Sequence, residues 1–98
     1  MKPRFLLPAQ EELAAAAAYY HDISSSLGRA FRKEARQTLD LILHNPNAWH
    51  PLAEPFRRCR FHRFPYAFIY EVKGNEIIIV AVAHLHRKPA YWHGRVDL

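Results

Sequence analysis

The sequence predicts an α+β fold in which an N-terminal strand and an α-helical hairpin pack on a mostly antiparallel β-sheet. Two observations lead to this prediction. Apolar residues recur at helical spacing through residues 8–45, whereas residues 61–84 are rich in Phe, Ile, Val and Tyr, which favour strands. Helices followed by strands favour two layers, with the helices on one face of the sheet. At 98 residues, we expect one domain over residues 1–98.

A short strand and two helices are expected first. Residues 4–7 predict the strand, and Pro8 suits the first turn of a helix because its missing N–H would be unpaired there. The first helix is expected over residues 8–23, and the serines at 24–26 begin a second helix that ends at Asn45-Pro46. One face of each helix is apolar and is expected to form core: Leu13, Ala16, Ala17, Tyr20 and Ile23 in the first helix, and Leu27, Phe31, Ala35, Thr38, Leu39 and Ile42 in the second.

Three further strands follow a proline-containing loop at residues 46–55. They are expected over residues 56–62, 66–72 and 77–83, with a hairpin turn between the last two. These last two strands are apolar at nearly every position. We therefore expect them to lie at the centre of the sheet, covered on much of both faces.

All the excess positive charge lies in the second half of the chain. Residues 1–54 hold six Lys or Arg and six Asp or Glu, whereas residues 55–98 hold eight against three, so the net charge of +5 comes from this half. Such asymmetry predicts a face for nucleic acid or for an acidic protein segment. Alternation along the second strand puts three basic side chains on one side, opposite Cys59 and Phe61: Arg58, Arg60 and His62.

Several other chemistries are not indicated. Paired cysteines and a helical His-x-x-x-His are both lacking, so we expect no metal site. The three glycines lie too far apart for a phosphate-binding loop, and no cofactor is expected. The single Cys59 is expected to be a small core residue of a protein in a reducing compartment. The apolar runs are shorter than the roughly 20 residues of a membrane helix, so we expect a cytoplasmic protein with no membrane partner.

The segment after the last strand is basic and aromatic. Its Arg87, Tyr91, Trp92 and Arg95 are residue types that bind phosphate, stack on rings or anchor a protein partner. For Trp92 we favour burial against the core over a functional role, and for Tyr91 both roles stay open. His84 is expected to hydrogen-bond backbone at the strand end.

Two motifs frame the last strands: Arg-Phe-Pro-Tyr at residues 63–66 and His-x-x-Arg-x-Pro-x-Tyr-Trp at residues 84–92. Both resemble the RelE/ParE superfamily of bacterial toxins from type II toxin-antitoxin modules, in particular its ParE-like members. The resemblance implies the same β-α-α-β-β-β order. It also implies a toxin, of a kind linked to plasmid stabilization, that poisons DNA gyrase and is neutralised by a cognate antitoxin, a small protein with an acidic amphipathic segment. The residues expected to contact gyrase or antitoxin are Arg58, Arg60, Arg63, Arg87, Tyr91, Trp92 and Arg95.

The RelE branch of the same superfamily implies an alternative function, cleavage of messenger RNA on the ribosome. On that alternative the catalytic residues are Arg58, Arg60, Arg87 and Tyr91, which orient the 2′-hydroxyl and neutralise the transition state. Ala67, however, stands where that branch has a strand arginine, so the nuclease set is incomplete. We favour the gyrase inhibitor and leave open whether the protein is an enzyme. A third alternative is a non-toxic relative that only binds its partner.

Overall fold

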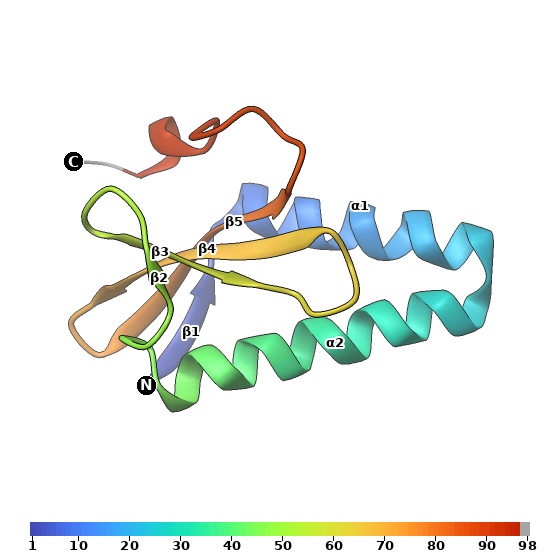
Figure 1. Ribbon diagram of the computed structural model, residues 1–98, viewed down its shortest axis with the longest axis horizontal. Coiled ribbons are helices and arrows are strands. Elements are labelled where there is room, and N and C mark those ends of the chain that lie inside the picture. The colour runs from blue at the N-terminus through green and yellow to red at the C-terminus, as the bar shows by residue number, and fades with distance from the viewer. Residues whose placement is uncertain (97–98) are drawn as a thin grey trace.

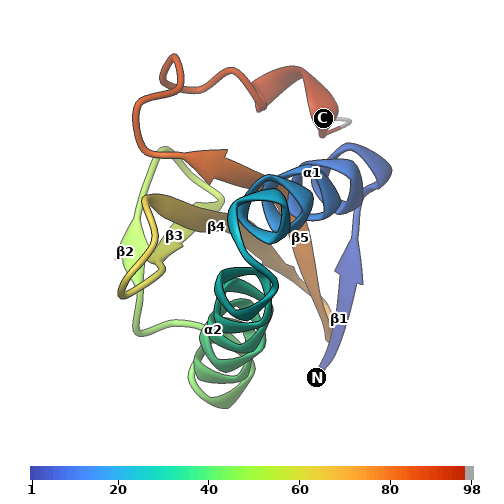
Figure 2. The same ribbon diagram turned by 90° about the vertical axis from the view of Figure 1, so that its right-hand side faces the viewer.

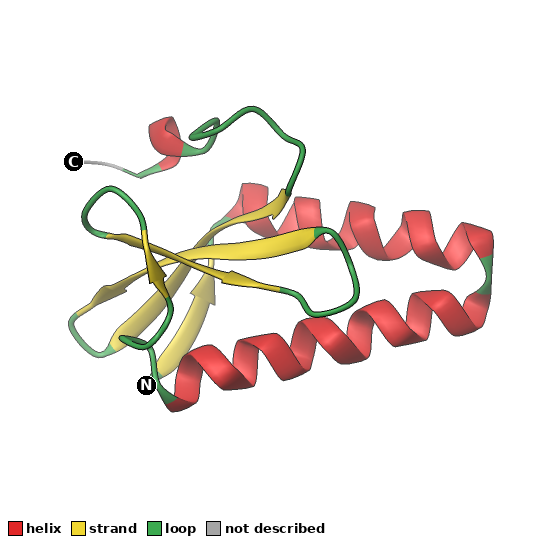
Figure 3. Ribbon diagram, viewed as in Figure 1, coloured by secondary structure: helices red, strands yellow, loops and turns green. Residues whose placement is uncertain are grey.

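Two helices cover one face of a five-stranded sheet in the computed structural model, which describes residues 1–96 (Figures 1 and 3). The sheet order is β1-β5-β4-β3-β2, with β1 parallel to β5 and the other pairs antiparallel. The predicted α+β class is confirmed. The elements are β1 (Lys2–Phe5), α1 (Leu7–Ile23), α2 (Ser25–His44), β2 (His50–Pro51), β3 (Phe56–Arg60), β4 (Tyr66–Lys73), β5 (Glu76–His84) and the 3-10 helix η1 (His93–Arg95).

Two local features shape the helical hairpin: a cap at the start of α2 and a close contact between α2 and α1. The Ser24 hydroxyl accepts the Leu27 N–H at 3.1 Å and so caps α2. Gly28 lies so close to α1 that a Cβ there would be 2.9 Å from the Cα of His21. The far end of the hairpin extends beyond the sheet (Figure 1). The predicted core role of Ile23 is therefore wrong: its side chain lies at that end and is 59% exposed.

The sheet buries side chains on both faces. Phe68, Tyr70 and Ile79 pack against the helices, in the larger cluster. The opposite face carries a second cluster, which includes Ile69 and Val80. As expected, β4 and β5 are the central strands.

A β-bulge interrupts the pairing of β4 with β5. Ile69 pairs with Ala81 and Tyr70 with Ile79, which leaves Val80 as the extra residue. Consequently Val80 and Ala81 both belong to the cluster on the face away from the helices.

Some strand boundaries differ from those predicted. β1 begins at Lys2 and gives way to α1 at Leu7, and the expected loop at residues 46–55 contains β2, where His50 pairs with Arg58. β3 ends at Arg60, so His62 lies outside the strand and not in a row with Arg58. Just beyond the strand, the Phe61 N–H still donates to the Tyr66 carbonyl at 2.8 Å. In the loop that follows, the carboxylate of Glu34 accepts the N–H groups of Arg63 at 2.7 Å and Phe64 at 3.4 Å.

Within residues 1–96, no helix is long and apolar enough to cross a membrane.

Candidate functional site: the C-terminal segment and the basic sheet face

The C-terminal segment, residues 85–96, covers the sheet face that the helices leave open. Figure 2 looks along the helices and shows this segment (red) close to β5 and α1 and away from α2. Trp92 is its anchor: it is 5% exposed and packs edge-on against Phe56, with ring centroids 4.7 Å apart. The expected burial of Trp92 is thereby confirmed. Ala90 has a φ of 60° and turns the chain just before Tyr91.

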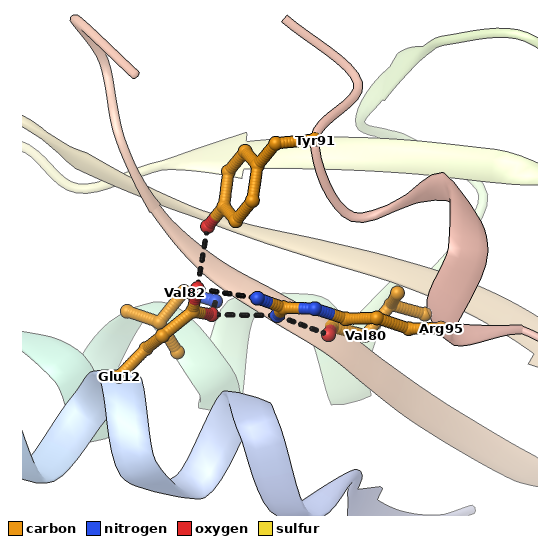
Figure 4. Close-up of polar contacts among 5 residues, drawn as sticks. All are labelled: Glu12, Val80, Val82, Tyr91 and Arg95. Atoms are coloured by element: carbon orange, nitrogen blue, oxygen red, sulfur yellow. Dashed lines mark hydrogen bonds and ion pairs between the residues drawn. The ribbon is translucent and has the colours of Figure 1, made fainter. Parts of the chain in front are cut away.

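The carboxylate of Glu12, on α1, accepts hydrogen bonds from two side chains of the segment (Figure 4). Arg95 donates to Oε1 of Glu12 through Nη1 and to Oε2 through Nη2, both at 2.8 Å. The Tyr91 hydroxyl donates to Oε2, also at 2.8 Å. We call Glu12, Tyr91 and Arg95 the Glu12 cluster.

The Glu12 cluster also completes the hydrogen bonding of β5. β1 ends at Phe5, opposite Ile79, so the next backbone groups of β5 have no strand partner on that side. The Val82 N–H donates instead to Oε1 of Glu12 at 2.9 Å, and the Val80 carbonyl accepts from Nη1 of Arg95 at 3.1 Å. Both backbone groups are thus satisfied, as buried backbone requires.

Ionisation of the Glu12 cluster follows from these contacts. Burial alone would raise the pKa of Glu12, but the hydrogen bonds from Arg95, Val82 and Tyr91 outweigh it, and the pKa is lowered. Burial and the bond to Glu12 raise the pKa of Tyr91 far above its usual range. Tyr91 therefore stays a neutral phenol that donates its proton to Glu12.

Sequence reasoning missed Glu12. It reads as one of two acids near the start of a helix, which usually lie in solvent. The signal that could have found it is its spacing: Glu12 is three residues after Ala9 and four before Ala16, and both alanines are buried. A carboxylate on the buried face of a helix needs a partner.

A pocket of about 330 Å³, which we call the C-terminal pocket, lies between the sheet and this segment. Four of the seven residues predicted as site residues line it: Arg58, Arg87, Tyr91 and Trp92. The Arg87 guanidinium lies over the Tyr91 ring, 4.1 Å from its centroid. Ala67 also lines the pocket, where the alternative nuclease would need an arginine.

Arg60 and Arg63 lie elsewhere. Both are exposed and line a separate hollow beside α2, together with Lys33 and His62. The seven predicted residues thus divide into three groups. Arg58 and Arg87 line the C-terminal pocket, and Arg60 and Arg63 line the α2 hollow. Tyr91, Trp92 and Arg95 hold the C-terminal segment in place, and the first two of these also line the C-terminal pocket.

Two smaller expectations are confirmed. Cys59 is buried, and burial raises the pKa of its thiol to about 11, so it is a core residue and not a thiolate nucleophile. His84 bonds to backbone at the end of β5, where its Nδ1 accepts the His86 N–H at 3.1 Å.

An apolar groove of about 290 Å³ lies on the helix side of the molecule. Side chains of β1, both helices and β4 line it, including Leu13, Leu39 and Phe68. Two exposed arginines of α2 also line it, Arg32 and Arg36. The groove can therefore contact an apolar side chain and an acidic one at the same time.

Comparison with known proteins agrees with this architecture. Residues 4–89 match the family described as the ParE toxin of the type II toxin-antitoxin system, parDE. The chain therefore belongs to the ParE toxin family, and the expected RelE/ParE membership is confirmed. Comparison with curated proteins finds no match.

A solved structure shares the fold. It is described as a chromosomal ParDE TA system from P. aeruginosa, and it superimposes with a TM-score of 0.74 at 21% identity. The alignment covers 88% of this chain and 97% of that one.

Proposed function

We propose that the protein inhibits growth as the toxin of a type II toxin-antitoxin module, that its target in the cytoplasm is DNA gyrase, and that a cognate antitoxin neutralises it. Family membership supports the toxin assignment. The observation that carries the choice of a binding protein over an enzyme is the contact of the Tyr91 hydroxyl with Glu12, at 2.8 Å.

That contact weighs against cleavage of messenger RNA. A tyrosine that must take or give a proton has to reach the RNA, whereas the Tyr91 hydroxyl points at a carboxylate and its pKa is raised. Ala67 cannot neutralise a transition-state charge. Arg60 of the nuclease set lines a different hollow from Arg58, Arg87 and Tyr91.

The predicted residues have different roles at the proposed target surface. Arg60, Arg63 and Arg87 are exposed and are assigned to direct contacts with gyrase. Arg58 lies partly buried in the C-terminal pocket. Tyr91, Trp92 and Arg95 contribute by holding the segment that carries Arg87 in one conformation.

The apolar groove between β1 and the helices is the proposed antitoxin site. An acidic amphipathic segment fits it because apolar side chains would meet Leu13, Leu39 and Phe68 while acids pair with Arg32 and Arg36. The apolar groove lies on the helix side of the sheet, whereas the C-terminal pocket lies on the opposite face.

Induction of the protein alone tests the target. We expect growth arrest with filamentous cells and DNA damage signalling, intact bulk messenger RNA, and inhibition of purified gyrase. Co-expression of the neighbouring reading frame should restore growth. Codon-positioned transcript cleavage before any DNA damage response would favour the nuclease, and normal growth at high soluble expression would leave only the non-toxic binding protein.

A further inference from the structure

The α2 hollow has a volume of about 510 Å³ and lies between α2 and the end of β3 with the loop that follows it. Its helix wall is a single stripe of α2 whose residues recur every three or four positions. The stripe consists of Ala30, Lys33, Glu34, Gln37, Thr38 and Leu41. On the other side, β2 pairs with β3 only at Arg57 and Arg58, so no described strand covers the sheet edge at Arg60. The hollow is therefore open to a partner.

Three exposed cations from different parts of the fold line the α2 hollow. Lys33 comes from α2, Arg60 from β3 and Arg63 from the loop after β3. None of the three forms an ion pair within residues 1–96. Glu34 is the one acid of the described lining, and its buried carboxylate already accepts the N–H groups of Arg63 and Phe64. The local potential is therefore positive, which favours an acidic partner.

The uncharged part of the lining favours a protein over a nucleic acid. Leu41 is 51% exposed and lies beside the cations, where it can contact an apolar side chain of a partner. The described lining contains no Phe, Tyr or Trp. Proteins that bind single-stranded nucleic acid stack the bases on such rings. An acidic segment of a protein with an apolar side chain would satisfy both the charges and the exposed leucine.

The length of the stripe indicates the conformation of that segment. From Ala30 to Leu41 the helix rises by about 16 Å. An extended chain covers this distance with about five residues. Every second side chain of an extended chain points to the same side, so a few acids and an apolar residue can face the hollow together. A short extended segment is therefore sufficient to reach all the cations.

We propose that the α2 hollow docks an acidic, extended segment of the protein that the toxin inhibits. Acids of that segment pair with Lys33, Arg60 and Arg63, and an apolar side chain packs on Leu41. The inference rests on the proposed function and specifies the chemistry of the contact with the target. The apolar groove proposed for the antitoxin shares no lining residue with the α2 hollow. Substitutions in the hollow therefore distinguish the two partners.

Calorimetry of the purified protein at low salt tests the charge pairing with three probes: the peptide Glu-Glu-Leu-Glu-Glu, the same peptide with Gln in place of Glu, and a short single-stranded DNA. We expect the acidic peptide to bind, to weaken as salt is added, and to bind more tightly than either of the other probes. Lys33→Gln and Arg60→Gln should each weaken its binding by about two- to fivefold, as is usual for exposed ion pairs. Lys73→Gln, an equal change of charge at an exposed position outside the hollow, should leave binding unaltered.

A second pair of variants tests the apolar contact. Leu41→Ser should weaken binding of the acidic peptide by about two- to fivefold, because its leucine loses its partner. Ile23→Ser is the matched control, since Ile23 is 59% exposed on α1 and does not line the hollow. Both variants should melt close to the wild-type temperature. A loss of binding in Leu41→Ser alone would then reflect the contact and not unfolding.

Purified gyrase links the hollow to the proposed function. The double variant Lys33→Gln/Arg60→Gln should bind gyrase at least about fivefold more weakly than the wild type and should bind the cognate antitoxin unchanged. A double variant that binds and inhibits gyrase as the wild type does would overturn the inference and leave the proposed function intact. A wild type that binds the acidic peptide through Lys33 and Arg60 but does not bind gyrase would support the hollow and overturn the gyrase target.

Three further results would overturn the inference and assign the hollow to another occupant. Tighter binding of the DNA than of the acidic peptide, lost in the double variant, would assign it to nucleic acid. Weaker binding of the antitoxin by the double variant would assign it to the antitoxin. A dimer of the wild type in sedimentation that Leu41→Ser dissociates would assign it to a second copy of this chain.

Discussion

Glu12 and Arg95 lie 83 positions apart in the chain and form a two-pronged ion pair, with both N–O distances 2.8 Å. The pair joins the first helix to the last turn, so the C-terminal segment closes over the sheet. Both side chains are less than one-fifth exposed. Solvent therefore screens the pair less than it would screen an ordinary surface ion pair.

Glu12→Gln should destabilise the fold. The amide keeps one acceptor but loses the charge that pairs with Arg95. Loss of one partner of a fully buried pair costs roughly 3 to 5 kcal/mol, and since this pair keeps some exposure we expect about 1 to 3 kcal/mol. Glu11→Gln is the matched control, because Glu11 is exposed on the same helix, and it should stay within about 0.5 kcal/mol. Denaturant unfolding measures both, and equal values would contradict the role given to Glu12.

Acid should weaken the same contact. The folded pKa of Glu12 lies below its ordinary value of 4.5, so its contribution to stability is complete above that pH and is lost as the pH falls through the folded pKa. The difference in unfolding free energy between the wild type and Glu12→Gln should therefore be constant near neutrality and shrink in acid. If this difference in unfolding free energy grew on acidification, the pKa of Glu12 in the folded protein would be raised and not lowered.

Much of the fold could be predicted from the sequence because its signals are local. Helical spacing, the Ser24 cap and the proline after Asn45 determine the hairpin, and all three are found in the structure. The bulge at Val80 could not be predicted, since an apolar run looks the same with or without one extra residue. Helical periodicity places Ile23 on the apolar face of the first helix, but it does not say where the sheet beneath that face ends, and Ile23 lies beyond that end (Figure 1).

The candidate site was predicted in composition but not in arrangement. The basic and aromatic residue types are visible in the sequence, and Arg58, Arg87 and Tyr91 do meet at one pocket. The pairing of Glu12 with Arg95 depends on how residues 85–96 cross the sheet, which no local pattern encodes. The role of the seven residues in target binding stays a prediction.

Trp92→Ala should threaten folding. The indole is buried between Phe56 and the apolar sheet face. Truncation of a buried aromatic costs roughly 3 to 5 kcal/mol, whereas the total stability of a domain of this size is about 5 to 10 kcal/mol. Tyr19→Ala removes an aromatic ring that is 61% exposed and should cost less than about 1 kcal/mol. Similar melting temperatures for the two variants would show that Trp92 is not an anchor.

Arg87→Ala should separate toxicity from stability. Arg87 is exposed, and its described aromatic contact is the Tyr91 ring, so the loss of stability should be about 0.5 to 1 kcal/mol or less. We expect toxicity to be abolished in a growth assay. Arg29→Ala, at another exposed arginine, should remain toxic. An Arg87→Ala protein that melts normally and stays fully toxic would remove Arg87 from the target surface.

Gly28→Ala should open the helical hairpin. In an isolated helix alanine is favoured over glycine by about 1 kcal/mol. Here the new Cβ would lie 2.9 Å from both the Cα and the Cβ of His21, and the Cα belongs to backbone that cannot move without separating α1 from α2. We expect the crowding to prevail, with a net loss of about 1 to 3 kcal/mol. Gly94→Ala meets nothing within 4 Å and is the control. The proposed antitoxin groove lies between these helices and the sheet, so Gly28→Ala should also weaken antitoxin binding. Denaturant unfolding tests the effect on stability, and a Gly28→Ala protein more stable than the wild type would show that the helices can separate without cost.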